Sequence, residues 1–416
     1  MIDHPALITG SRHAGQGAKR RLQAASHTRV YTFDELWEQT GVTQRRRLLY
    51  LLNSFDAGGA ERAPGLLLDG GAFEGFDVDV VGLVRGGGFH MEDLRRITGR
   101  VEALLGDRRL RPWHVLPAHR VLRDRLPGYD AVVLSLPQAN LAGRLAALRL
   151  KRRPVLYSFH HNTHFSNPLY GPMFRATASV VDGLLADSLG TAEAAAKLYG
   201  RPAPSASILP LVRFDQRHPQ PALPWRPGRP LRLVTAGRLT GVKRQDALIE
   251  AVARLQAAGR DVRLTIFGEG PRREALGRQI AQAGLKTCVV LAGHAGDWLQ
   301  ADADAFVLSS RHEGLCIVAL EAMHRGWPVI AAPVGELPRH AAAGALHLLP
   351  SADGAAVARA IGALMDAPQR LYAIRAAGID YANTQYGAGV VRDAYAAFNR
   401  RLHADVAVRQ AHGGIP

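Results

Sequence analysis

The chain has 416 residues, of which 47% are hydrophobic, and a formal net charge of +16. This length exceeds one ordinary hydrophobic core, so we expect two domains, and the absence of an apolar run of 18 uncharged residues argues against a transmembrane helix. The two cysteines, Cys288 and Cys316, exclude a disulfide framework and a CxxC metal site. We therefore expect buried thiols and a cytoplasmic location, with peripheral attachment to the inner face of the membrane as the alternative.

Residues 1–46 have the composition of a basic extension. Gly, Ser and His alternate there with Lys19, Arg20, Arg21, Arg45 and Arg46. They hold no compact apolar segment, so they do not read as a secretory signal. We expect a partly disordered arm that precedes the first domain.

Short apolar runs alternate with longer helical stretches from residue 47 onward. The first series of expected strands is Leu48–Asn53, Val78–Val84, Ala131–Leu136, Val155–Phe159, Leu184–Ala186 and Ser207–Leu209. Continuous apolar strands separated by helices predict a parallel sheet covered on both faces. We therefore expect an α/β, doubly wound, Rossmann-like domain over residues 47–216.

A glycine pair, Gly58 and Gly59, follows the first expected strand within the segment Gly-Gly-Ala-Glu-Arg. Glycines at the start of a helix let a ligand approach the backbone and the helix N-terminus closely. A plain strand-to-helix turn explains the pair equally well. Pro64 fits only if the helix starts nearby, because its ring breaks an interior turn.

Positive charge is concentrated between Arg95 and Arg125, where nine arginines accompany three acidic residues. Lys151, Arg152 and Arg153 form a second cluster. Such an excess favours an anionic partner: nucleic acid, an acidic membrane face or a phosphorylated substrate. A membrane-docking patch and an ordinary solvated basic surface are equally compatible with it.

Three histidines, His160, His161 and His164, follow the fourth expected strand. No cysteine or second acidic cluster lies at ligand spacing, so we expect no metal site. The favoured interpretation is a loop histidine that points into a cleft and bonds a substrate hydroxyl.

The segment 217–230 contains five prolines in 14 residues and cannot lie inside a helix or a central strand, so we interpret it as an interdomain linker. The second series of strands is Leu231–Ala236, Val262–Phe267, Val289–Leu291, Ala305–Leu308, Val329–Ala331 and Leu346–Leu349. Helices are expected at Arg244–Ala258, Arg272–Ala283 and Leu315–Arg325. A second Rossmann-like domain over residues 231–385 would leave a ligand cleft between the two domains.

Two cations, Arg238 and Lys243, follow the first strand of this second domain. The carboxyl ends of parallel strands face the ligand crevice, so these cations could neutralise a diphosphate. Arg would do so through a bidentate fork and Lys as a point charge.

A Gly-Glu-Gly turn, Gly268, Glu269 and Gly270, precedes the next helix, which is expected to start near Pro271. Its small residues would let a nucleobase or a sugar ring lie against the backbone. Ordinary turn and cap chemistry is the alternative explanation.

The paired carboxylates Glu313 and Glu321 form the sharpest pattern. Glu313 ends a loop, Gly314 and Leu315 open an apolar helix, and Glu321 interrupts its apolar run. Backbone amides at a helix N-terminus bind phosphate, and Glu313 could accept hydrogen bonds from sugar hydroxyls. A carboxylate in an apolar run needs a partner; ribose hydroxyls are one candidate, and a partly exposed helix face is the alternative.

Together these motifs resemble the family 4 glycosyltransferases of GT-B fold, over roughly Leu48 to Leu402. The paired glutamates carry the resemblance furthest, and the Gly-Gly-Ala-Glu-Arg, Gly-Arg…Lys and Gly-Glu-Gly-Pro segments occur in the family's order. The resemblance implies a retaining, metal-independent transferase without a cofactor. It would move a sugar from a UDP- or GDP-sugar to a glycan or lipid-linked acceptor, usually in bacterial cell-surface polysaccharide or lipopolysaccharide synthesis. No nucleic-acid partner is expected.

The resemblance also implies roles for matching positions. The catalytic residues would surround the departing diphosphate and the reacting sugar: His161, Arg238, Lys243 and Glu313. The donor-binding residues would be Gly58, Gly59, Gly268, Glu269, Gly270, Gly314, Leu315 and Glu321. His160 is the rival to His161. Residues 386–405 would form a helix that crosses back to the first domain, followed by a tail at 406–416.

Three departures from the family pattern bear on the acceptor and the choice of sugar. The turn before the linker reads Leu209–Asp215 instead of an Asn-Gly-Val-Asp-like turn, Val-Gly-Glu-Leu after Pro333 lacks a common second Gly, and Pro64 intrudes near the first helix. Two other functions remain open: a basic nucleic-acid- or membrane-binding protein without transferase activity, and a GT-B sugar-nucleotide epimerase.

Overall fold

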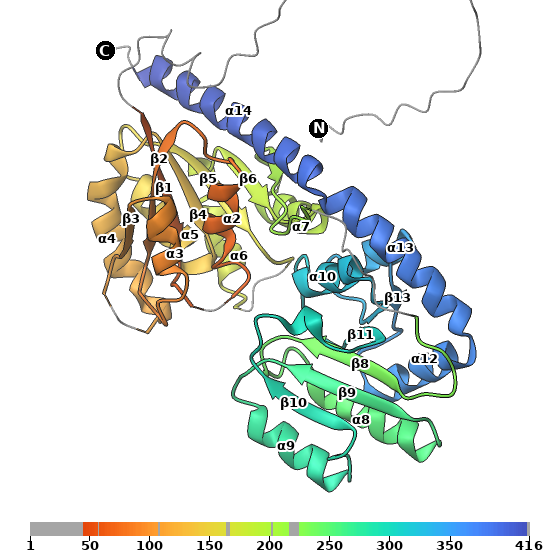
Figure 1. Cartoon of the computed structure of the whole chain (residues 1–416). Helices are drawn as coiled ribbons and strands as arrows, with labels where there is room; N and C mark the ends of the chain where they lie inside the picture. The colour runs from red at the N-terminus through yellow and green to blue at the C-terminus, as the bar shows by residue number, and fades with distance from the viewer. Residues whose placement is uncertain are drawn as a thin grey trace, which may run out of the picture.

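The computed structural model describes residues 45–413, except Ala57, 107–108, 164–166, 201–202 and 216–223. Two parallel sheets covered by helices form two α/β domains (Figure 1). The predicted fold class, doubly wound in both halves, is confirmed. The expected extension lies almost wholly outside the described residues, as does the first half of the expected linker.

The first domain contains a seven-stranded parallel sheet in the order β3-β2-β1-β4-β5-β6-β7. Its strands are β1 (Arg46–Leu52), β2 (Phe76–Gly82), β3 (Arg100–Ala103), β4 (Ala131–Ser135), β5 (Val155–His160), β6 (Gly183–Ala186) and β7 (Ala206–Ile208). Its helices are α2 (Ala63–Asp69), α3 (Met91–Ile97), α4 (Val115–Arg125), α5 (Pro137–Ala147), α6 (Tyr170–Ala176) and α7 (Leu189–Tyr199). Strand β3 was not predicted, because this edge strand buries only Val101 between charged neighbours.

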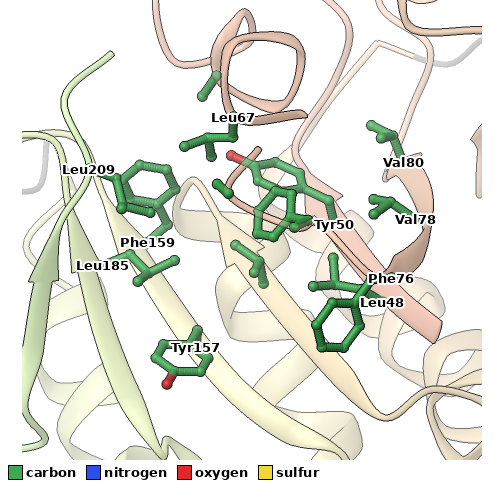
Figure 2. Packing of buried hydrophobic residues seen from close by; sticks show 14 of the residues in the cluster. Leu48, Tyr50, Leu67, Phe76, Val78, Val80, Tyr157, Phe159, Leu185 and Leu209 are labelled. Carbon is green, nitrogen blue, oxygen red and sulfur yellow. The ribbon is translucent and has the colours of Figure 1, made fainter. Parts of the chain in front are cut away.

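Alternate residues of the strands fill the two faces of this sheet. Leu48 and Tyr50 of β1 lie in one core with side chains of β2, β5 and β6, as Figure 2 shows. Leu49 and Leu51 lie in the core on the opposite face. Each buried side chain of this size contributes roughly 1.5–3 kcal/mol, so both faces hold the sheet in place.

The second domain contains a six-stranded parallel sheet in the order β10-β9-β8-β11-β12-β13. Its strands are β8 (Leu231–Ala236), β9 (Val262–Phe267), β10 (Val289–Gly293), β11 (Ala305–Leu308), β12 (Val329–Ala331) and β13 (His347–Leu348). Its helices are α8 (Gln245–Ala257), α9 (Arg273–Gln282), α10 (Ile317–Arg325), α11 (Leu337–Ala342), α12 (Gly354–Asp366) and α13 (Pro368–Tyr386). In both sheets the strand order reverses beside the first strand, so the loops after β1 and β4, and after β8 and β11, flank a crevice.

Helix α2 begins at Ala63, which places Pro64 in its first turn. The first N–H groups of a helix have no acceptor within the helix, so the lack of an N–H on Pro64 costs no hydrogen bond there. The helix therefore starts close enough to the glycine pair to aim its first turn at the crevice.

The C-terminal helix α14 (Ala388–Gly413) leaves the second domain and lies along the first (Figure 1). Its buried side chains join the first core: Val391, Tyr395, Phe398, Leu402 and Val406. It continues past the expected end at residue 405, because Val406 is buried and Arg409 bonds Asp182 at 2.6 Å. Within the described part of the chain no helix has the length and apolar character needed to cross a bilayer.

The two chain segments that pass between the domains lie side by side. Phe214 pairs with Gly387 in a parallel bridge, and the Phe214 amide donates to the Tyr386 carbonyl at 2.9 Å. The described end of the proline-rich segment, 224–230, packs on the second domain, where Trp225 is buried. The covalent connection between the domains is therefore confined to one narrow region.

Candidate functional site

The loops that follow β8 and β11 meet at the crevice. The Lys243 ammonium donates a hydrogen bond to Glu313 Oε1 at 2.7 Å, and the Glu313 side chain is only 11% exposed. The Arg311 amide donates to the Val242 carbonyl at 2.8 Å, which ties the two loops together by their backbones. Two residues predicted from separate motifs, a cation and a carboxylate, thus form one ion pair.

The Gly-Glu-Gly turn supports the loop after β8 from behind. Gly268 and Gly270 have φ of +131° and +156°, and a Cβ on them would lie 2.0 Å from the Gly237 carbonyl oxygen and 2.6 Å from the Leu239 carbonyl oxygen. These glycines are therefore required by backbone packing, whatever they bind. The Glu269 carboxylate forms an exposed ion pair with Arg273 at 2.9 Å.

The turn that leads into α10 lies against the first domain; the helix begins at Ile317, so Gly314 and Leu315 precede it instead of opening it as expected. A Cβ on Gly314 would lie 2.2 Å from the His161 carbonyl oxygen, and a Cβ on Gly59 would lie 3.8 Å from Ile317 Cδ1. Leu315 is buried in the core of the second domain. Predicted residues of both domains, Gly59 and His161 with Gly314, are thus neighbours at one boundary.

Two charged residues of the glycine-pair motif, Glu61 and Arg62, interact electrostatically with predicted donor-side residues across this boundary. Burial raises the pKa of Glu321, and the positive charge of Arg62 opposes that rise. Burial also raises the pKa of Glu61, and exposed Arg238 opposes it. Glu61 and Arg62 had no predicted role, although they lie within two to four residues of the glycine pair in the same motif.

The His161 ring does not point into open space. Its Nε2 bonds Ser135 Oγ at 2.8 Å, and its Nδ1 faces Asp187 Oδ2 at 4.0 Å. Burial lowers the pKa of His161 to about 3 and raises that of Asp187 to about 7, so a neutral imidazole is favoured. What His161 presents to Gly314 is its backbone carbonyl, and a contact of its ring with a substrate stays a prediction.

The rival histidine, His160, belongs to the interior of the first domain. Its Nε2 contacts Ser158 Oγ at 3.0 Å, within a buried network that includes Arg144. Burial lowers its pKa to about 3. His164 lies outside the described residues. Among the residues that are described, no group of three His, Cys, Asp or Glu side chains is arranged to hold a metal ion.

A pocket of about 160 Å³ opens between α2 and α3 in the first domain. Its lining combines charged groups with an apolar wall: Glu61, Arg62, Gly65, Leu66, His90, Asp93, Leu94 and Ile97. Glu61 and Arg62, which act on Arg238 and Glu321, thus also line this pocket. Of the cysteines, Cys316 is buried beside the site, whereas Cys288 is only partly buried.

Two family models match most of the described chain. Residues 57–212 match "Glycosyltransferase Family 4" and residues 230–367 match "Glycosyl transferases group 1". The two matches follow the division into a first and a second domain. They therefore cover both sides of the crevice.

Curated relatives match parts of the chain. A GDP-mannose-dependent phosphatidylinositol monomannoside mannosyltransferase of Mycolicibacterium smegmatis is 30% identical over 262 residues, which are 58% of this chain and 68% of that protein. The peptide N-acetylglucosaminyltransferase subunit GtfA of Streptococcus gordonii is 29% identical over 32% of this chain and 26% of that protein. A putative colanic acid biosynthesis glycosyltransferase of Salmonella typhimurium is 33% identical over 32% of this chain and 35% of that protein. The chain thus spans well under half the length of the last two.

Solved structures share the fold. A sucrose-phosphate synthase from Thermosynechococcus elongatus superimposes with a TM-score of 0.70 at 17% identity, covering 87% of this chain and all of that one. Anabaena HepE in complex with UDP and glucose superimposes with a TM-score of 0.67 at 18% identity, over the same shares. At these identities the likeness supports the GT-B architecture alone.

Proposed function

Because the chain belongs to the family 4 glycosyltransferases of GT-B fold, we propose that it transfers a sugar from a nucleotide-sugar donor to a hydroxyl acceptor. The observation that carries this proposal is the Lys243–Glu313 ion pair at the carboxyl ends of β8 and β11. It lies where parallel sheets of this type bind ligands. A cation, a carboxylate and the first amides of α10 together suit a diphosphate that is linked to a sugar.

The largest catalytic contribution in such a transfer is stabilisation of the negative charge that develops on the departing nucleoside diphosphate. Lys243 would move its charge from Glu313 to the diphosphate, and exposed Arg238 would add a second cation. Glu313, released from Lys243, would accept hydrogen bonds from the sugar hydroxyls. Glu321 would bind the ribose, with Arg62 close enough to balance its charge.

Retention of the anomeric configuration fits the surroundings of His161. Its ring is buried against Ser135 and its backbone carbonyl faces Gly314, so the His161 ring is not placed as a base at this point. A front-face substitution, in which a donor phosphate oxygen takes the acceptor proton, needs no such base. We place the acceptor on the first-domain side, where the pocket beside Glu61 and Arg62 offers polar groups and an apolar wall.

The donor is expected to be a UDP- or GDP-sugar, and the product a cell-surface polysaccharide or lipopolysaccharide. Relatives named for GDP-mannose and for colanic acid support this choice. A panel of nucleotide sugars tests it by thermal unfolding. A matching donor at 100 times its Kd adds about 2.7 kcal/mol, or roughly 5–10 °C in Tm.

The same panel checks the donor site. Glu321→Ala is expected to lose most of this shift, because the ribose hydroxyls lose their acceptor. Glu274→Ala, which removes an exposed carboxylate of α9, serves as the control and should keep it. If no nucleotide or nucleotide sugar raises the Tm of the wild-type protein, the transferase proposal fails.

We further propose that α4 docks on an anionic membrane that carries the acceptor. An open hollow of about 610 Å³ beside α4 is lined by His119, Arg120, Val121, Arg123, Asp124 and Arg149. Trp113 and Leu116 are exposed nearby, and Arg111 lies over the Trp113 ring at 5.1 Å. Arginines next to exposed apolar side chains are the combination that binds an acidic lipid interface.

Exchanging Arg120 and Arg123 for glutamate is expected to abolish sedimentation with vesicles that contain acidic lipid. Each basic residue near the surface contributes about 1 kcal/mol, so a double reversal removes most of the attraction. The control exchanges Arg254 and Arg278 of the second domain, with the same change of charge. The docking proposal would be contradicted if both variants sedimented equally with acidic vesicles. It would also be contradicted if the wild-type protein sedimented equally with neutral and with acidic vesicles.

A further inference from the structure

Glu336 is a buried carboxylate at the boundary between the two domains. It is only 4% exposed and lies in the turn between β12 and α11 of the second domain. Both of its carboxylate oxygens accept from the amide of Gly190, at 3.0 and 3.3 Å. Gly190 belongs to the first turn of α7 in the first domain, so a carboxylate of one domain accepts a hydrogen bond from the backbone of the other.

The contact depends on the residue types at both ends. The Gly190 amide is one of the first four of α7, which have no partner within the helix, and the positive end of a helix attracts a carboxylate. A Cβ on Gly190 would lie 2.3 Å from Glu336 Oε2. A Cβ at this position would therefore force the carboxylate to shift away from the amide.

A second link runs beside the first. The Arg339 guanidinium lies 3.0 Å from Glu336 Oε1 and 3.2 Å from Glu193 Oε2, and Glu193 is another residue of α7. Arg339 and Glu193 are exposed, so their pair is weaker than the buried contact. Both links nevertheless join the N-terminal end of α11 in the second domain to the same helix of the first.

The backbone of the turn between β12 and α11 also contacts the 313–315 loop, which we assign to the donor. The Glu336 amide donates to the Gly314 carbonyl at 3.1 Å. Gly335 has a φ of +58°, and a Cβ there would lie 2.4 Å from the same carbonyl oxygen. Gly314 in turn lies against His161 of the first domain. The interdomain contact of Glu336 is therefore continuous with the loop that we assign to the donor.

We propose that Glu336 is a positioning residue, a latch that holds the two domains closed and sets the 313–315 loop against the first domain. The chain passes between the domains only at Phe214 and Gly387 among the described residues, and these two adjoin each other. A connection at one narrow place permits rotation, which the latch opposes. The role in turnover rests on the proposed function, whereas the latch itself does not.

Two variants break the latch from opposite domains. Glu336→Ala removes the carboxylate, and Gly190→Ala excludes it by steric overlap. The second variant also improves the helix propensity of α7, so loss of folding does not explain its effect. The matched controls are Glu274→Ala and Gly277→Ala on α9, where a Cβ on Gly277 meets nothing within 4 Å.

Small-angle X-ray scattering is expected to show a larger radius of gyration for both latch variants and an unchanged radius for the controls. Turnover is expected to fall about tenfold in both, within the range of typical coupling between sites. Binding of the free nucleoside diphosphate should stay within twofold, because Lys243, Arg238 and the 313–315 loop lie in the second domain. Glu336→Gln keeps one acceptor oxygen, so its radius of gyration and its turnover should lie between those of the wild-type protein and Glu336→Ala.

Unchanged scattering in both latch variants would overturn the latch, as would a loss of nucleotide affinity equal to the loss of turnover. A different outcome would mark failure of the proposed function. The wild-type protein would then bind no nucleoside diphosphate, while scattering would still report whether Glu336 and Gly190 hold the domains together.

Discussion

Lys243→Ala lowers the turnover of sugar transfer by about a thousandfold. The Lys243 ammonium is the cation bonded to Glu313, and we assign it to the departing diphosphate. Loss of one preorganised group that stabilises developing charge costs roughly 10²–10³ in turnover, and loss of a full charge belongs at the upper end of that range. Initial rates with the donor identified by thermal unfolding measure the effect.

The Lys243→Ala protein is expected to remain folded. The Glu313 side chain is only 11% exposed, so the loss of its partner costs some stability, and thermal unfolding of the variant measures that cost separately from turnover. Lys286→Ala, an exposed lysine of the same domain, is the control and should retain wild-type turnover. Wild-type turnover in Lys243→Ala would refute the assignment of this lysine to the diphosphate.

Asp304→Ala lowers the free energy of unfolding of the second domain by about 3–5 kcal/mol. The Asp304 side chain is fully buried, and it accepts bidentate hydrogen bonds from Arg229 at 2.6 and 2.9 Å. The amide and guanidinium of Arg232 donate to it as well. Removal of the carboxylate takes the buried acceptor from Arg229 and Arg232, of which Arg232 keeps an ion pair with Asp302.

The pH dependence of this effect has a definite sign. Burial raises the pKa of Asp304, but hydrogen bonds from Arg232 and Arg229 lower it by more, so the folded pKa lies below the ordinary value. The stabilisation is therefore complete above the unfolded pKa of about 3.9 and is lost as the pH falls through the folded pKa. Urea unfolding at neutral and acidic pH should show the difference between wild type and Asp304→Ala shrink below about pH 4.

Asp366→Ala is the matched control for Asp304→Ala. Its carboxylate pairs with Arg260 on the surface of the same domain, so solvent replaces the lost partner and the loss of stability is much smaller. An equal loss in both variants would show that the buried cluster carries no special weight. Asp304 precedes β11 at the amino ends of the strands, away from the crevice, so turnover at neutral pH should survive in folded Asp304→Ala protein.

The sequence predicted every strand except β3, and the family resemblance is confirmed by both family models. The signals are local: apolar runs of strand length, glycines that follow them and a proline-rich break. Strand β3 escaped because one buried valine between charged residues makes no apolar run. The roles of the predicted donor and catalytic residues stay predictions.

The sequence by itself determined the two Rossmann-like units and the motifs that end their strands, because backbone propensity and apolar periodicity act between near neighbours. Only the tertiary structure decided which groups meet: the Lys243 ammonium with Glu313, and the Glu336 carboxylate with the Gly190 amide. It also brought the positive charge of Arg62 within electrostatic reach of Glu321. It also decided that the His161 ring lies buried between Ser135 and Asp187. Such pairings depend on how one domain is placed against the other, and no short-range pattern in the chain encodes that placement.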